Sequence, residues 1–144
     1  MLFHIDTNDY FSENSNKTRI ALAIISAIKL AKENDTHQIL IYSDVLSSLN
    51  GPFRETLGEE NFKNLKKSRQ IMLDAVNVFL EVKSSTTYFQ KGILIAIFPS
   101  INNLNSILTN YRVVDSIYIP YSASDFSTYI TTYLQSERLA CSEE

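Results

Sequence analysis

A short, unbroken apolar run, residues 93–98, lies between Gly92 on one side and Pro99 on the other. Its isoleucines and its phenylalanine favour a β-strand over a helix. A strand that is apolar on both faces needs a cover on both faces, which is typical of parallel sheets in α/β proteins. We therefore expect this run to be the central strand of the domain.

Four further segments are predicted to join the same sheet. Residues 2–5, 38–42 and 116–119 are short apolar runs that end in polar residues. Residues 78–83 are ambiguous, because they could also continue the helix that precedes them. Their alternating, β-branched end favours the strand slightly over that helix.

Apolar residues at three- and four-residue spacing predict the helices between these strands. The clearest helix covers residues 17–34, and Ser15 or Asn16 would cap its amino end. Residues 45–57 are expected to form a short helix and then a turn, because Gly-Pro interrupts them. The composition of residues 59–77 predicts one helix with an apolar stripe and a basic opposite face.

Two more helices are expected near the end of the chain. Ser100 would cap a helix over residues 101–110, and Ser122 or Ser124 would cap the last helix. Strand, helix and strand in succession form right-handed crossovers between parallel strands.

The chain of 144 residues is expected to be a single α/β domain. The predicted architecture is a three-layer Rossmann-like sandwich, with a mainly parallel sheet of four or five strands and helices on both faces. Residues 136–144 are polar and are predicted to be a frayed tail.

Charge and composition narrow the classes of partner. The formal net charge of −3 gives no electrostatic reason to expect a nucleic acid. The candidate basic patch is Lys63, Lys66, Lys67 and Arg69, which is interpreted as a solvated helix face. No apolar segment approaches the ~20 residues that span a bilayer, so a membrane is not expected either.

The counts of cysteine and glycine carry two more expectations. With Cys141 as the single cysteine, no intramolecular disulfide can form, which fits a reducing compartment and a cytoplasmic location. Three glycines are too few for the usual phosphate-cradling motifs, and no cofactor is expected.

Polar residues follow several of the predicted strands. In open α/β sheets, ligands bind outside the carboxyl ends of the strands, where helix amino ends converge. The pattern predicts a site for a small anionic ligand there, although the same residue types also serve as helix caps. The candidate ligand-binding residues are Asp6, Thr7, Asn8, Ser43, Asp44, Ser100 and Asn102.

Residues 3–8, with the sequence Phe-His-Ile-Asp-Thr-Asn, resemble the opening of PIN-domain nucleases, in which a strand ends in Asp-Thr-Asn. The resemblance covers these six residues and implies that Asp6 would be a ligand of a catalytic Mg²⁺ or Mn²⁺. That family needs further carboxylates around the metal, and the late strand of this chain ends in Pro120 and Tyr121 instead of an acid. The alternative hypothesis is therefore a divergent metal-dependent nuclease or phosphoesterase that uses Asp6 and Asp44.

Several tyrosines crowd into the last strand and helix. Tyrosine combines a large apolar ring with a polar hydroxyl, which suits a surface that binds another protein. The alternative is that these rings pack between the strand and the helix, and the pattern does not decide between the two. The candidate interface residues are Tyr118, Tyr121, Tyr129 and Tyr133.

The leading functional hypothesis is a small intracellular module without catalytic activity. It would bind a protein partner, either a second copy or another protein, and a small anionic ligand at the carboxyl ends of the strands. His4 and His37 are interpreted as structural histidines.

Overall fold

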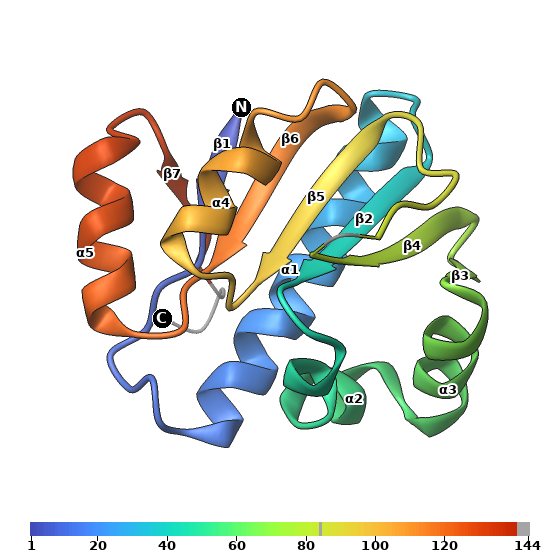
Figure 1. Ribbon diagram of the computed structural model, residues 1–144, viewed down its shortest axis with the longest axis horizontal. Helices are drawn as coiled ribbons and strands as arrows, with labels where there is room; N and C mark the ends of the chain where they lie inside the picture. The colour runs from blue at the N-terminus through green and yellow to red at the C-terminus, as the bar shows by residue number, and fades with distance from the viewer. Residues whose placement is uncertain (84, 141–144) are drawn as a thin grey trace.

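The computed structural model describes residues 1–83 and 85–140, and it confirms the three-layer α/β sandwich (Figure 1). The sheet has seven strands in the order β3-β4-β2-β5-β6-β1-β7, more than the four or five expected. Every neighbouring pair is parallel except β3 and β4, which are antiparallel. The strands are β1 (Leu2–His4), β2 (Gln38–Ser43), β3 (Gln70–Leu73), β4 (Val76–Val82), β5 (Gly92–Ile97), β6 (Val113–Ile119) and β7 (Glu137–Arg138).

Helices cover both faces of this sheet. On one face lies α1, together with α2 and α3, and on the other face lie α4 and α5 (Figure 1). The helices are α1 (Glu13–Glu33), the 3₁₀ turn η1 (Leu46–Leu49), α2 (Pro52–Leu57), α3 (Glu59–Ser68), α4 (Ile101–Leu108) and α5 (Ala123–Thr132). Within the described residues, each of these helices is too short or too polar to cross a bilayer.

The central strand is β5, as the apolar run predicts. All six of its residues are buried, and they alternate between two cores. Ile93, Ile95 and Ile97 face the core under α1, whereas Leu94 and Ala96 face the core under α4 and α5. This division explains why the run has no polar face.

The helix α1 begins earlier than the spacing of its apolar residues predicts. Its cap is Ser12, whose hydroxyl accepts a hydrogen bond from the backbone N–H of Ser15, so neither Ser15 nor Asn16 is the cap. Ile25 points to solvent with 67% of its surface exposed, and the buried stripe is formed by Ile20 and small alanines instead.

The prediction of one helix over residues 59–77 is wrong beyond Ser68. Arg69 adopts a left-handed backbone with φ of 64° and ends α3, and a β-hairpin of β3 and β4 follows. Asp74 and Ala75 form its two-residue turn with φ of 48° and 65°, and positive φ at both positions is the hairpin geometry that matches strand twist. The slight preference for a strand over residues 78–83 is confirmed by β4.

Two smaller expectations also change. The short helix expected before Gly51 is the 3₁₀ turn η1, but a second helix follows it where a turn was expected. Gly51 is the cap of α2, and Pro52 occupies its first turn, where a missing N–H costs nothing. The tail is not frayed throughout, because β7 pairs in parallel with β1 and extends the sheet. Cys141 lies outside the described residues.

Candidate functional site

The sheet has a topological switch point between β2 and β5. After β2 the chain crosses the face that carries α2 and α3 and returns in β4, the neighbour of β2 on the side away from β5. It leaves β5 along the opposite face, through α4, and returns in β6, on the other side. Loops that diverge in this way open a crevice at the carboxyl ends of the two strands, which is where α/β proteins bind ligands.

A cleft with a volume of about 630 Å³ lies at this switch point. The segments that follow three strands line it: Asp44 and Ser48 of η1 follow β2, Phe98 and Ser100 follow β5, and Tyr121 and Asp125 of α5 follow β6. Of the predicted ligand-binding residues, the structure brings Asp44 and Ser100 together here.

Asp44 is held at the amino end of α4. Its carboxylate accepts a hydrogen bond from the backbone N–H of Ser100 (2.7 Å) and another from the side-chain amide of Asn103 (3.0 Å). The hydroxyl of Tyr42 donates a third (3.2 Å), and burial followed by the charge of Asp44 raises the pKa of this hydroxyl to about 12. The carboxylate therefore takes the place that an anion would occupy at this helix end.

Phe98 forms part of the cleft wall with a strained backbone. Its φ is 51°, in the left-handed region that residues with a large side chain rarely adopt. The ring packs edge-on against Tyr121 (centroids 5.8 Å apart) and under the guanidinium of Arg19 (5.7 Å). Strain of this kind concentrates at binding and active sites.

Arg19 supports the rim of the cleft from below. One terminal nitrogen donates to the carbonyl oxygens of Ile5 (3.1 Å) and Pro120 (2.9 Å), and the other donates to Oδ1 of Asn16 (2.6 Å). Burial lowers the pKa of Arg19 to about 10. This one side chain therefore joins the carboxyl ends of β1 and β6.

Asp6 does not join Asp44. It forms an ion pair with Arg138 on β7 (2.7 Å). Three strand steps separate β1 from β2, and at about 4.8 Å for each step their ends lie roughly 14 Å apart. No cluster of three potential metal-ligating side chains occurs within residues 1–83 and 85–140.

The remaining predicted ligand-binding residues lie apart from one another. The Thr7 hydroxyl accepts a hydrogen bond from the N–H of Asp9, and Asn8 is exposed beside it. Ser43 is buried, and its hydroxyl donates to the carbonyl of Val45. Asn102 is exposed in the first turn of α4.

The four candidate interface tyrosines divide into two groups. Tyr118 and Tyr129 are buried in the core under α5 with ring centroids 4.4 Å apart, so they cannot meet a partner on the surface. Tyr133 is half-buried, and its hydroxyl donates to Asn105 on α4 (2.6 Å). Tyr121 alone of the four is fully on the surface, with 66% of its area exposed.

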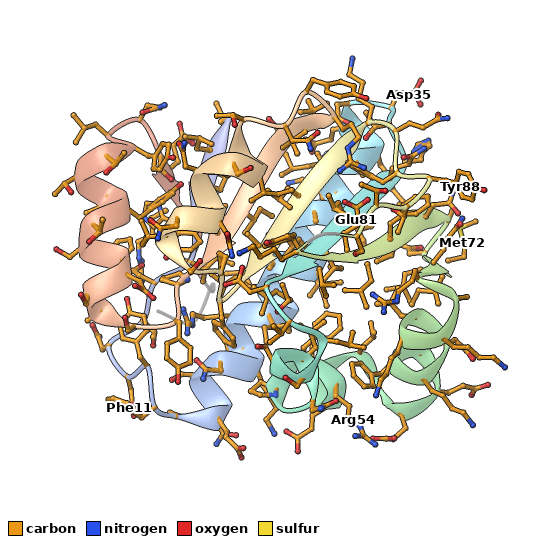
Figure 2. All side chains as sticks on the ribbon, viewed as in Figure 1. Phe11, Asp35, Arg54, Met72, Glu81 and Tyr88 are labelled. Carbon is orange, nitrogen blue, oxygen red and sulfur yellow. The ribbon has the colours of Figure 1, made fainter. Side chains whose placement is uncertain are left out.

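A second, polar cleft of about 400 Å³ lies between α4 and the loop after β4. Its floor contains Glu81, near the middle of Figure 2, which forms a buried two-bond ion pair with Arg112 (2.9 Å for each bond). Glu81 also accepts hydrogen bonds from the N–H and the hydroxyl of Thr87. Burial alone would raise the pKa of Glu81, but the hydrogen bonds from Arg112 and Thr87 and the charge of Arg112 together lower it. The contacts of Glu81 also hold the loop after β4 against the sheet.

Four residues at this edge of the sheet are not among those predicted from the sequence: Arg19, Phe98, and the exposed Phe11 and Val45 in the loops after β1 and β2. Phe98 belongs to the expected strand by composition, and nothing in the sequence reveals its positive φ. Arg19 lies on the face of α1 that packs against the sheet, and a charge among apolar residues there is a signal that could have found it. Phe11 and its neighbour Tyr10 are aromatic residues in an otherwise polar segment, which is a similar signal.

No protein-family model matches this chain, and no curated protein matches its sequence.

Proposed function

We propose that this protein is a non-catalytic module that binds a protein partner at the carboxyl edge of its sheet, around the switch-point cleft. The observation that carries the proposal is the exposure of three large apolar side chains there. Phe11 is 99% exposed, Tyr121 66% and Val45 53%, and they belong to the loops that follow β1, β6 and β2. Large apolar side chains exposed at the same edge of a sheet are typical of interaction sites.

The charge around the cleft indicates the chemistry of the partner. Asp9, Glu13, Asp44 and Asp125 lie in the same loops or in the first turns of α1 and α5, and none of them forms an ion pair with another described residue. We name these four acids, with Phe11, Val45 and Tyr121, the carboxyl-edge surface. An acidic surface opposes a small anion and favours a partner that offers basic and apolar side chains together.

No observation favours the alternative of a metal-dependent nuclease or phosphoesterase, because Asp6 and Asp44 are apart and each already has a partner. The proposal includes a cytoplasmic location, and its support is the single cysteine in the sequence.

Site-specific photocrosslinking in the native host tests the proposal. A photoreactive phenylalanine analogue at position 11 or 121 is expected to form an adduct with a protein. The matched controls are positions 88 and 111, where Tyr88 and Tyr111 are 87% and 91% exposed in loops that precede β5 and β6, at the opposite edge. Equal adducts at all four positions, or none at positions 11 and 121, would contradict the proposal.

A further inference from the structure

We infer that the partner is a second copy of this chain, which docks its α3 helix on the carboxyl-edge surface. The inference rests on the proposed function and adds the identity of the partner. It follows from a basic surface on the same molecule whose chemistry complements the carboxyl-edge surface.

The basic surface is built on α3. Phe62 and Leu65 are buried, which fixes the helix so that Lys63, Lys66 and Lys67 face solvent. None of the three lysines forms an ion pair with another described residue. They lie at three- and four-residue spacing, so their ammonium groups share one side of the helix.

We name Lys63, Lys66 and Lys67 the α3 lysine surface. Met72 on β3 does not belong to it, because its neighbours Ile71 and Leu73 pack against the core under α3 and successive side chains of a strand point to opposite faces. The α3 lysine surface therefore offers cations, whereas the carboxyl-edge surface offers acids and aromatic rings, and ammonium groups are attracted to both.

In Figure 1, α3 lies at the right of the molecule, whereas the loop between β1 and α1, which carries Phe11, lies at the lower left. Because the two surfaces do not overlap, one copy can give its α3 lysine surface and receive that of another copy at the same time. Such a head-to-tail contact continues from copy to copy and forms a ring or an open chain.

Sedimentation velocity at about 0.3 mM protein tests the inference, since this concentration populates a complex with a Kd of about 0.1 mM. The parent is expected to form dimers and larger species in about 10 mM salt. It is expected to be monomeric in about 1 M salt, where the Debye length falls from about 30 Å to about 3 Å.

Two variants each remove one of the surfaces. Lys63→Glu with Lys67→Glu reverses the α3 lysine surface, and Phe11→Ser with Tyr121→Ser removes the aromatic rings of the carboxyl-edge surface. Each variant alone is expected to be a monomer. An equal mixture is expected to form a dimer and nothing larger, because each variant keeps the surface that the other has lost.

The matched control is Lys29→Glu with Lys91→Glu, which makes the same change of charge at two exposed lysines outside α3 and is expected to associate like the parent. Urea unfolding of every variant confirms that it is folded. A monomeric parent in low salt, or a mixture that stays monomeric, would overturn the inference.

The outcomes separate the inference from the proposed function. If the parent is monomeric and position 11 still crosslinks to a different protein in the host, the proposed function stands. The inference that the partner is a second copy of this chain is then wrong. If the lysine variant abolishes association and the Phe11, Tyr121 variant does not, the inference falls, because the lysines then contact another part of the second copy, and the proposed function is decided by the crosslinks at positions 11 and 121.

Discussion

At the scale of single residues, Arg19 holds the rim of the cleft, and within residues 1–83 and 85–140 no carboxylate forms an ion pair with its guanidinium. Arg19 is 3% exposed, and its guanidinium lies against the rings of Tyr10 (5.1 Å) and Phe98 (5.7 Å). Carbonyl oxygens and aromatic faces both stabilise a buried cation, and the planar fork of arginine reaches two carbonyls at once.

Arg19→Met is therefore expected to lower the free energy of unfolding by about 2–6 kcal/mol, because two buried carbonyls lose their donor at about 1–3 kcal/mol each. The measurement is urea unfolding. Arg54→Met is the control, since Arg54 is an arginine in an ion pair on the surface, and it is expected to leave the unfolding midpoint unchanged. Equal midpoints for the two variants would refute this role of Arg19.

His4 is a second buried polar residue with a structural role. Its Nδ1 shares a hydrogen bond with the hydroxyl of Ser136 (2.8 Å), and its ring packs on Phe126 (5.1 Å). Burial lowers its pKa below 6.5, the charge of Asp6 opposes this shift, and the charge of Arg138 adds to it.

A lowered pKa in the folded state means that the unfolded chain binds the proton more readily. The contribution of His4 to stability is therefore complete above pH 6.5 and is lost as the pH falls from 6.5 towards its lowered pKa. We expect the parent to lose more stability than His4→Gln between about pH 7.5 and about pH 5.5, by urea unfolding. Carboxylates common to both proteins cancel in this difference, so parallel curves would show that His4 is not the cause.

At the scale of secondary-structure elements, the hairpin of β3 and β4 shows where the sequence pattern is ambiguous. Met72, Leu73 and Val76 continue the helical spacing of α3, yet they equally fit a strand, a turn and a strand. The hairpin turn has neither Asn-Gly nor Asp-Gly, the usual signal, but Asp74 and Ala75. What decides the structure is the pairing of β4 with β2, a contact that no local pattern reports.

Ala75 carries a positive φ that glycine would adopt without strain, so Ala75→Gly is expected to stabilise the protein by about 1 kcal/mol. Ala21→Gly in the middle of α1 is the matched control, and it is expected to destabilise the protein by about 0.5–1 kcal/mol. Urea midpoints that move in opposite directions would support the turn geometry. A loss of stability in both variants would contradict it.

At the scale of the whole molecule, the parallel sheet and its two covers were predictable, because runs such as β5 are apolar on both faces. The position of a site at the carboxyl edge follows from that topology too. The residues that make up the site do not follow from the topology, because Ser100 and Asp44 both serve to cap α4. The spacing of residues along the chain predicts neither the order of the strands in the sheet nor the exposure of a side chain. The distance of Asp6 from Asp44 and the burial of Tyr118 and Tyr129 could therefore be seen only in the structure.

The two cores share β5, so damage on either of its faces should reach the entire domain. Ile95→Ala and Leu94→Ala are each expected to lower the free energy of unfolding by about 2–5 kcal/mol, in one cooperative transition. Ile25→Ala, at an exposed isoleucine of α1, is expected to change it by less than about 0.5 kcal/mol. A change for Ile95→Ala as small as that for Ile25→Ala would exclude β5 as the shared centre.

The position of β1 between β6 and β7 bears on how the protein is made. Leu2 pairs with Ser116 and Phe3 pairs with Glu137, so β1 is synthesised long before either of the strands it pairs with. The Met1 ammonium and its partner Asp115 are 114 positions apart, a delay on the order of 10 s at 5–20 residues per second. During that interval β2 can pair with β4 and then with β5, while the first strand stays unpaired and open to chaperones.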